Sequence, residues 1–305
     1  MIYDNIKTAV LGGDRRQLYA VMHLAEAGAK IYTSGIDISL LPKIKQKTIF
    51  CEASPSEALK DASVIILPFP VSADGVHVNA PLDKNGELGD VKLLSLLRLA
   101  KENAIFIGGK IPEHFEAKLR EEGHRVYDLL SIESLETKNA YITAEAALSI
   151  AMNTLSRTVS GAKIAITGFG RISKQLARLF ASLGAFVTIA ARKDGDLAYA
   201  ETLRYKTVKI EGDGWCESLT DGYDMIFNTV PHRIMGRDFL ETIDKKTVLV
   251  ELASVPGGFD LVAAHELGSN ISWAPSLPGK YAPESAGELI AESIIKIINE
   301  EAIPL

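Results

Sequence analysis

The sequence contains only two cysteines, Cys51 and Cys216, and they lie far apart in the chain. Without C-x-x-C spacing they offer neither a disulfide framework nor a zinc-binding motif. The histidines, aspartates and glutamates also show none of the spacings typical of metal ligands. We therefore predict no bound metal, and two unlinked thiols favour a reducing cytoplasm.

Long apolar runs and an excess of positive charge are absent as well. No stretch reaches the roughly 18–20 apolar residues that a membrane-spanning helix needs. The first residues, MIYDNIKTAVLGG, show no basic leader followed by a signal-peptide core. The net charge is −6 and the basic residues are scattered, which argues against nucleic-acid binding. We expect a cytoplasmic protein that binds neither membranes nor nucleic acids.

What the sequence does contain is an alternation of short apolar runs with segments of helical period, over a length of 305 residues that favours two domains. In the first half the predicted strands are 8–12, 30–35, 63–70, 104–109 and 124–130, and the predicted helices are 15–28, 54–62, 91–103 and 112–124. This order predicts a parallel sheet covered on both faces. We assign residues 1–138 and 285–305 to a flavodoxin-like substrate lobe, because the apolar helix 285–302 is expected to pack back onto it.

A second pattern of the same kind follows a run of Ala, Leu, Ile and Met at helical spacing, which predicts one linking helix over 139–161. The strands predicted after it are 163–170, 186–193, 224–231, 246–254 and 271–278, with a helix at 171–184. We assign residues 162–284 to this second lobe. The expected fold class is α/β, with two doubly wound parallel-sheet lobes.

A glycine turn, ITGFGRIS, stands between the first strand and the first helix of the second lobe. Gly168 permits the tight turn, Gly170 admits the pyrophosphate, and the following helix N-terminus attracts its charge. Ser173 replaces the usual third glycine and is small enough for close packing. The strand before, the helix after and the strand FVTIA at the right distance favour a dinucleotide site over a plain turn. The predicted contacts are Gly168, Phe169, Gly170, Arg171, Ile172 and Ser173.

The end of the next strand, FVTIAARK, favours NADP(H) as the cofactor. An NAD site would place Asp or Glu there to hold the ribose hydroxyls, whereas this chain has Ala191, Arg192 and Lys193. A cationic pair suits the 2′-phosphate of NADP, although it could also be an ordinary solvated strand end. We therefore expect the second lobe, residues 162–284, to be a Rossmann NAD(P)-binding domain that takes NADP. Two later loops are expected beside the nicotinamide and its ribose, and they contain Asn228, Thr229, Val230 and Pro231, and Ala253 and Ser254.

At this point the sequence resembles the family of the dipicolinate synthase A subunit. The matching stretches are VLGGDRRQLYAVMHLAEAGAKIY, GFGRISKQLARLFASLGAFVTIAARK, ELASVPGGFD at 251–260 and LPGKYAPESAGELIAESI at 277–294. More distantly, the layout looks like alanine and 2-hydroxyacid dehydrogenases. The resemblance implies an oxidoreductase of spore formation in the mother-cell cytoplasm. It would act with a second, flavoprotein-like B subunit of the synthase, converting the hydroxy-tetrahydrodipicolinate-derived precursor to dipicolinate by loss of water and of a hydride.

Binding a dicarboxylate substrate requires cationic groups, and its conversion requires a group that transfers a proton. We expect Arg16, at a helix N-terminus, and Lys280, before the last helix, to bind carboxylates. His77, in the loop after strand 63–70, is the candidate for proton transfer. For each of the three, an ordinary surface role stays open. Weaker candidates for substrate contact are Gln17, Ser72, His232 and Arg233.

Two other functions remain open from the residues alone. The same two-lobe design could serve an amino-acid or 2-hydroxy-acid dehydrogenase. The chain could also be a nucleotide-binding partner without turnover of its own. The apolar linking and terminal helices make a homo-oligomer plausible.

Overall fold

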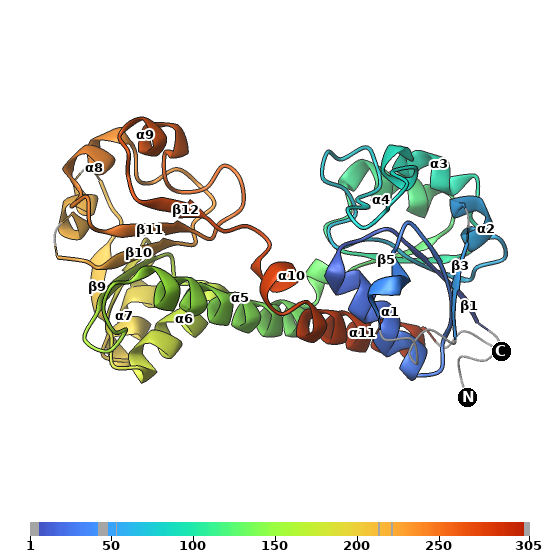
Figure 1. Ribbon diagram of the computed structural model, residues 1–305, viewed down its shortest axis with the longest axis horizontal. Helices are drawn as coiled ribbons and strands as arrows, with labels where there is room; N and C mark the ends of the chain where they lie inside the picture. The colour runs from blue at the N-terminus through green and yellow to red at the C-terminus, as the bar shows by residue number, and fades with distance from the viewer. Residues whose placement is uncertain (1–5, 42–47, 53, 213, 221, 302–305) are drawn as a thin grey trace. The chain divides into compact units, whose positions relative to one another are not determined.

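The computed structural model describes residues 6–41, 48–52, 54–212, 214–220 and 222–301 (Figure 1). The chain forms two compact units, Met1–Asn139 with Pro278–Leu305, and Ala140–Leu277. Each unit contains a six-stranded sheet in which all paired neighbours are parallel. The predicted fold class, α/β with two doubly wound lobes, is confirmed. Within the described ranges, every helix is too short or too polar to cross a bilayer.

The sheet of the first unit has the strand order of a Rossmann fold. Its strands are β1 (Lys7–Leu11), β2 (Lys30–Ser34), β3 (Ile49–Cys51), β4 (Val64–Ile66), β5 (Ile105–Gly108) and β6 (Arg125–Asp128), in the order β3-β2-β1-β4-β5-β6. The flavodoxin-like assignment is therefore wrong. The sequence prediction missed β3, which has only three residues and no visible sequence pattern. Without it, the remaining order is that of flavodoxin.

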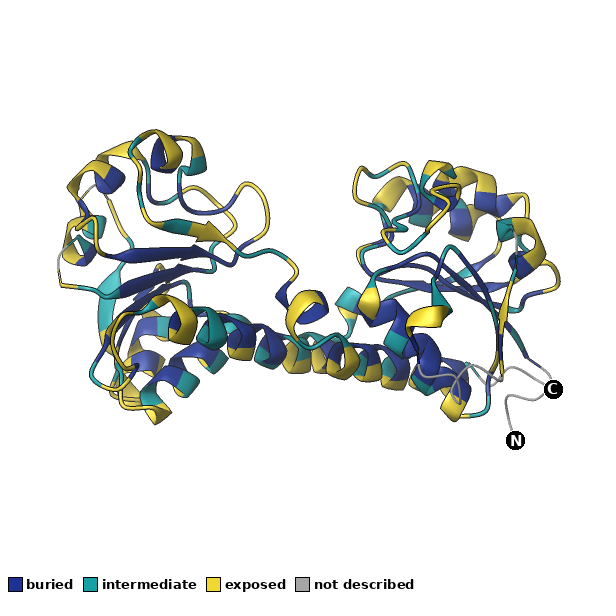
Figure 2. Cartoon of the chain, viewed as in Figure 1, coloured by how far each residue is buried: buried dark blue, intermediate teal, exposed yellow. Residues whose placement is uncertain are grey.

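Helices cover both faces of this first sheet (Figure 1). They are α1 (Arg15–Glu26), α2 (Pro55–Leu59), α3 (Leu93–Leu97), α4 (Glu113–Glu121) and α11 (Pro283–Glu300). α1 and α11 pack with Val10, Ile66 and Ile107 on one face. α2, α3 and α4 pack on the other. The late helix α11 thus belongs to the first core, as its apolar pattern predicted. The central strands of both sheets are buried (Figure 2).

The second unit repeats the same strand order. Its strands are β7 (Lys163–Thr167), β8 (Phe186–Ala191), β9 (Lys206–Lys209), β10 (Met225–Asn228), β11 (Val248–Glu251) and β12 (Ile271–Trp273), in the order β12-β11-β10-β7-β8-β9. The helices are α6 (Arg171–Ser182), α7 (Asp194–Thr202), α8 (Arg237–Thr242) and α9 (Leu261–Glu266), together with part of α5 (Glu133–Thr154). α5, α6 and α7 contribute to the core on one face, and α8 and α9 to the core on the other.

Several element boundaries differ from the sequence prediction; the helix predicted at 91–103, for example, is α3 at Leu93–Leu97. Two of the differences bear on how the chain divides into units. The linking helix, predicted at 139–161, is α5 at Glu133–Thr154. It begins earlier because Glu133 and Glu136 in its first turn suit the positive helix end. It stops earlier because the chain must turn before β7, and Val159 is buried in that turn. The strand predicted at 271–278 ends at Trp273, and α10 (Leu277–Tyr281) follows. Residues 278–284 fall in the first unit, not in the second as assigned.

Candidate functional site

The glycine turn of the second unit begins with a residue whose backbone requires glycine. Gly168 follows β7 with φ +85, in the left-handed region. Its N–H donates to Ala190 O at 2.8 Å, which ties the turn to β8. A Cβ built at Gly168 would lie 2.7 Å from Thr229 Oγ1. The protein itself therefore needs glycine here, whether or not a ligand binds.

Gly170 differs, because neither its backbone angles nor its described neighbours require glycine. It is the N-cap of α6 with an extended backbone, φ −82 and ψ −166, which any residue adopts. The residue is exposed, and a Cβ built there would meet no atom of the described residues within 4 Å. No side chain in the described part of the chain caps the helix at this position. The space over the start of α6 is open, and uncapped helix N–H groups attract anions.

Ser173, the substitute for the third glycine, is fully buried and fixes the turn to β10. Thr229 Oγ1 donates to Thr167 O at 2.8 Å, so Ser173 Oγ donates to Thr229 Oγ1 at 2.7 Å. The neighbouring Phe169 is 5% exposed, and Phe169 and Ile172 pack with the core. These two side chains face the protein, so a nucleotide would meet the backbone of this turn and not their side chains.

The end of β8 presents two unpaired cations. Ala191 is buried, while Arg192 and Lys193 are exposed. Among the residues that the structure describes, neither cationic side chain has a hydrogen bond or ion pair. The nearest following carboxylate, Asp194, forms an ion pair with Lys209. The strand end therefore offers free positive charge, and positions 190–193, where an NAD site places its ribose-binding acidic residue, contain no Asp or Glu.

The loops after β10 and β11 are organised by Glu251, which the sequence analysis missed. Its carboxylate is fully buried and accepts hydrogen bonds from Asn228 Nδ2 at 2.6 Å and Ala253 N at 2.9 Å. Val230 and Pro231 follow Asn228, and Ser254 follows Ala253; Pro231 and Ser254 are exposed. A signal was present: Glu251 interrupts the otherwise apolar run VLVELA, where an acidic residue is unexpected.

The remaining basic candidates of the second unit are on the surface. His232 is exposed, and Arg233 Nη1 donates to Asp260 Oδ2 at 2.6 Å. Arg233 is therefore engaged with a carboxylate of its own unit. Neither residue gains support from the geometry as a substrate ligand.

In the first unit, Arg16 is buried and already paired. It is 5% exposed, and its Nε and Nη2 contact Asp14 at 3.1 and 2.8 Å. Nη2 also donates to Phe69 O at 2.5 Å, and Asp14 caps α1 through Arg16 N. Only Nη1 has no partner among the described residues. A substrate carboxylate could use that one nitrogen, so the freely available guanidinium expected from the sequence is not what the structure contains.

Gln17 and Lys280 are each next in the chain to a residue at the ion pair of Arg16 and Asp14. Gln17 follows Arg16 itself, and Lys280 follows Gly279, which lies beside both charged side chains. Gln17 is 2% exposed, its Nε2 donates to Leu67 O at 3.1 Å, and its Oε1 has no partner among the described residues. Lys280 is exposed, and a Cβ on the preceding Gly279 would lie 3.0 Å from Arg16 Nε. A buried acceptor without a donor is costly, which points to an occupant of this region.

His77 forms a pair with Asp74 in the loop after β4. His77 Nδ1 lies 2.7 Å from Asp74 Oδ2, and His77 is 37% exposed. Asp74 Oδ1 accepts from the N–H groups of Val76 and His77 and from the Ser72 hydroxyl. The hydrogen bond from the His77 side chain, with those from the backbone, holds the pKa of Asp74 well below its usual value. Ser72 donates to Asp74 and not to His77, so it is no activated nucleophile.

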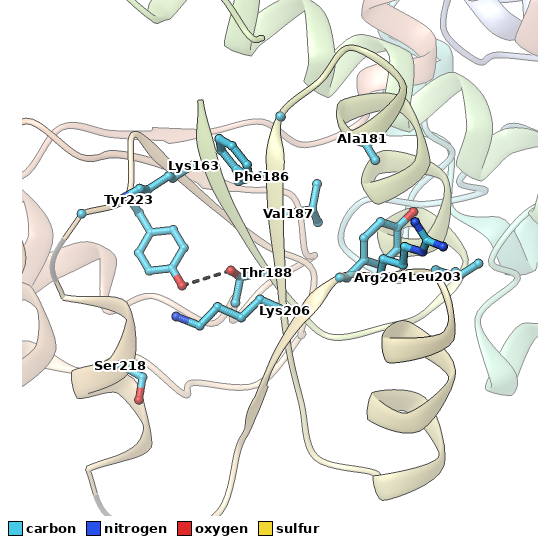
Figure 3. Close-up of a pocket in the computed structure, with 13 residues that line it drawn as sticks. Lys163, Ala181, Phe186, Val187, Thr188, Leu203, Arg204, Lys206, Ser218 and Tyr223 are labelled. Carbon is cyan, nitrogen blue, oxygen red and sulfur yellow. Dashed lines mark hydrogen bonds between the residues drawn. The ribbon is translucent and has the colours of Figure 1, made fainter. Parts of the chain in front are cut away.

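A cavity of about 500 Å³ lies elsewhere on the second unit, at the amino ends of its strands (Figure 3). Lys163, Phe186 and Lys206 line it, and Tyr223 donates to Thr188 at 3.1 Å within it. Ligands of open α/β sheets bind at the opposite, carboxyl ends. This cavity is therefore not the candidate nucleotide site. Within the described ranges no group of three His, Cys, Asp or Glu side chains could hold a metal ion.

Comparison with known proteins identifies the family. The family model for the N-terminal domain of the dipicolinate synthase A subunit matches residues 7–130. The dipicolinate synthase A subunit of Bacillus subtilis (strain 168) is 30% identical over 97% of this chain and 96% of its own length. The crystal structure of the dipicolinate synthase A subunit from Bacillus halodurans matches with a TM-score of 0.84 and 24% identity, over 98% of this chain and 99% of that one.

An L-alanine dehydrogenase structure shares the fold at 14% identity, with a TM-score of 0.61 over 95% of this chain and 90% of that one. The close resemblance expected from the sequence and the distant one to alanine dehydrogenases are therefore confirmed. The relationship at 30% identity extends over nearly the whole chain. The chain belongs to the family of dipicolinate synthase A subunits.

Proposed function

We propose that this protein is an NADP(H)-dependent oxidoreductase, the A subunit of a dipicolinate synthase. The substrate is the ring formed from hydroxy-tetrahydrodipicolinate. Loss of water leaves a dihydropyridine dicarboxylate, and transfer of a hydride to NADP⁺ with release of a proton gives dipicolinate and NADPH. Aromatisation drives the step, so the protein mainly binds and orients the ring.

The observation that carries the proposal is the open space at Gly170. Neither its backbone angles nor its packing requires glycine, so the missing side chain is explained by the close approach of a pyrophosphate. The uncapped N-terminus of α6 supplies N–H donors and a favourable dipole at the same point. The unpaired cations of Arg192 and Lys193 then favour NADP(H), because a 2′-phosphate needs a positive partner.

For the substrate we propose groups of the first unit. Asp74 accepts from His77 Nδ1–H, which leaves Nε2 available to take the proton released on aromatisation. Lys280 and the Nη1 of Arg16 bind carboxylates of the ring, and Gln17 Oε1 accepts from a donor on the substrate or on a bridging water. In this arrangement Asp14 holds the guanidinium of Arg16 in place.

The family name also suggests a wider setting. We propose that the chain works with the second, B subunit of the synthase in the mother-cell cytoplasm of a spore-forming bacterium, and that it forms a homo-oligomer. Size-exclusion chromatography with light scattering, with and without the B subunit, tests both associations.

The decisive experiment supplies the purified chain with the hydroxy-tetrahydrodipicolinate precursor and NADP⁺. We expect near-ultraviolet pyridine absorbance and NADPH to rise together, either with the chain alone or once the B subunit is added. Turnover of alanine, lactate or glycerate without pyridine formation would favour the amino-acid or hydroxy-acid dehydrogenase. Pyridine formation by the B subunit on its own, at a rate unaffected by this chain, would refute the proposal.

A further inference from the structure

Glu251 is a buried acidic group for which the proposed chemistry has no role. It is the last residue of β11 and is fully buried. Oε1 accepts from Asn228 Nδ2 and Ala253 N at 2.6 and 2.9 Å, and Oε2 accepts from Gly258 N and Phe259 N at 2.8 and 3.1 Å. All four partners are N–H donors, which suits an ionised carboxylate. Within the described chain it has no cationic partner.

Glu251 continues a row of side chains across the carboxyl end of the sheet. Thr167, Asn228 and Glu251 are register partners on β7, β10 and β11. The Thr167 hydroxyl donates to Asn228 Oδ1 at 2.5 Å, and Asn228 Nδ2 donates to Glu251. Asn228 also bonds the N–H and the C=O of Val230. The row therefore connects the glycine turn with the loops after β10 and β11.

The paired glycines after β11 are explained by this row. Gly257 has φ +77, and a Cβ there would lie 2.9 Å from Glu251 Oε2. A Cβ on Gly258 would lie 2.5 Å from the side chain of Asn228. These glycines allow the loop to fold onto the buried carboxylate, in contrast to Gly170, which faces open space.

We propose that Glu251 is a positioning residue at the nicotinamide end of the nucleotide site and that its charge favours the oxidised cofactor; this rests on the proposed function. In the Rossmann fold the loops after the fourth and fifth strands lie at the ligand-binding edge. The nicotinamide ring is cationic when oxidised and neutral when reduced. A buried anion with no cation beside it is weakly screened, so it stabilises the oxidised ring and leaves the reduced ring unaffected. An enzyme that takes a hydride from its substrate gains from this preference.

The test compares the dissociation constants of NADP⁺ and NADPH for the full chain and three variants. Glu251→Gln removes the charge and turns an NH₂ group toward two N–H donors. We expect the affinity for NADP⁺ relative to NADPH to fall about tenfold. Asn228→Asp with Glu251→Gln restores one carboxylate on the neighbouring strand and the bond between the two side chains. In this double variant we expect the ratio to return to within about threefold of wild type. The surface change Glu241→Gln, on α8, is the matched control and leaves the ratio unchanged.

If Glu251 had a purely structural role, its replacement would weaken the binding of NADP⁺ and NADPH equally. An unchanged ratio of the two affinities in folded Glu251→Gln protein therefore overturns the charge proposal. If that variant does not fold, the double variant carries the test. It must fold, and its affinity for NADP⁺ relative to NADPH must stay within about threefold of wild type. A folded double variant in which this ratio has fallen about tenfold contradicts the proposal equally.

Hydrogen exchange of the nucleotide-free protein separates this inference from the proposed function. In Glu251→Gln the side chain keeps one oxygen, so we expect the backbone amides that face the NH₂ group, either Gly258 and Phe259 or Ala253, to exchange at least about tenfold faster than in wild type. Unchanged exchange would refute the positioning role whatever binds. If wild type binds neither nucleotide while these amides lose protection in the variant, the proposed function fails and the loop-positioning role stands.

Discussion

Replacement of Gly170 by alanine separates nucleotide binding from folding. The methyl group would meet no atom of the described residues within 4 Å, and the backbone at φ −82 and ψ −166 suits alanine. Alanine is a poorer N-cap than glycine by a few tenths to about 1 kcal/mol. It also restricts the unfolded chain, which returns about 0.4–1 kcal/mol. The free energy of unfolding should therefore change by less than about 0.5 kcal/mol.

Nucleotide binding should respond strongly to the same methyl group. It occupies the place where a pyrophosphate would approach the backbone, and it prevents at least one charge-assisted hydrogen bond from the start of α6. Such a bond contributes about 1.5–3 kcal/mol, which corresponds to roughly a 10- to 150-fold weaker affinity for NADPH. Isothermal titration calorimetry measures the affinity, and thermal unfolding measures the stability.

The chain contains a matched control in Gly236. It is the N-cap of α8 with nearly the same backbone, φ −85 and ψ −168, and a Cβ there also meets none of the described atoms within 4 Å. Gly236→Ala should match Gly170→Ala in stability and leave NADPH affinity at the wild-type value. Wild-type affinity in folded Gly170→Ala, or an equal loss in both variants, would refute the reasoning about Gly170.

Three further changes test other parts of the molecule. Arg192→Asp should weaken the binding of NADPH at least about tenfold, since a charge-assisted bond to the 2′-phosphate is lost, and should leave the affinity for NADH unchanged. Fluorescence titrations measure both affinities, and an equal loss for the two nucleotides would contradict the NADP assignment. Because the pKa of Asp74 is lowered in the folded chain, its bonds to the Val76 and His77 amides should persist at pH 4 and fail only as the pH falls further toward that lowered value. Hydrogen exchange at pH 4 checks this, and protection already lost there would contradict it. Gly287→Ala would place a Cβ 2.6 Å from Arg16 O and 2.8 Å from Ala20 N. We therefore expect the free energy of unfolding, measured by thermal unfolding, to fall by about 1–3 kcal/mol. In the control Gly195→Ala, where the Cβ meets no described atom within 4 Å, it should fall by less than about 0.5 kcal/mol.

The sequence predicted the features that depend on local pattern. The alternation of apolar runs was sufficient for two doubly wound lobes, and the glycine turn was located because strand, turn and helix agreed. Features that depend on pairing across the chain were not predictable. Strand β3 is three residues long and exists because it pairs with β2. Missing it changed the expected fold of the first unit.

Side-chain partners were hidden for the same reason. Arg16 was expected to be a free cation, but its Nε and Nη2 donate hydrogen bonds to Asp14, two residues earlier. Glu251 and Asn228 lie 23 positions apart in the chain, and only the register of β10 and β11 brings them together. A residue type can indicate chemistry, whereas its partner is known only from the three-dimensional arrangement.

The place of α11 in the chain has a consequence for how the protein is made. Its buried residues, among them Ile290 and Ile294, fill the core of the first unit together with α1. Ribosomes synthesise them after all of Ala140–Leu277. During translation the apolar surface of α1 therefore stays uncovered by α11 until the second unit has been synthesised. We expect chaperone binding to the nascent chain to matter most in that interval.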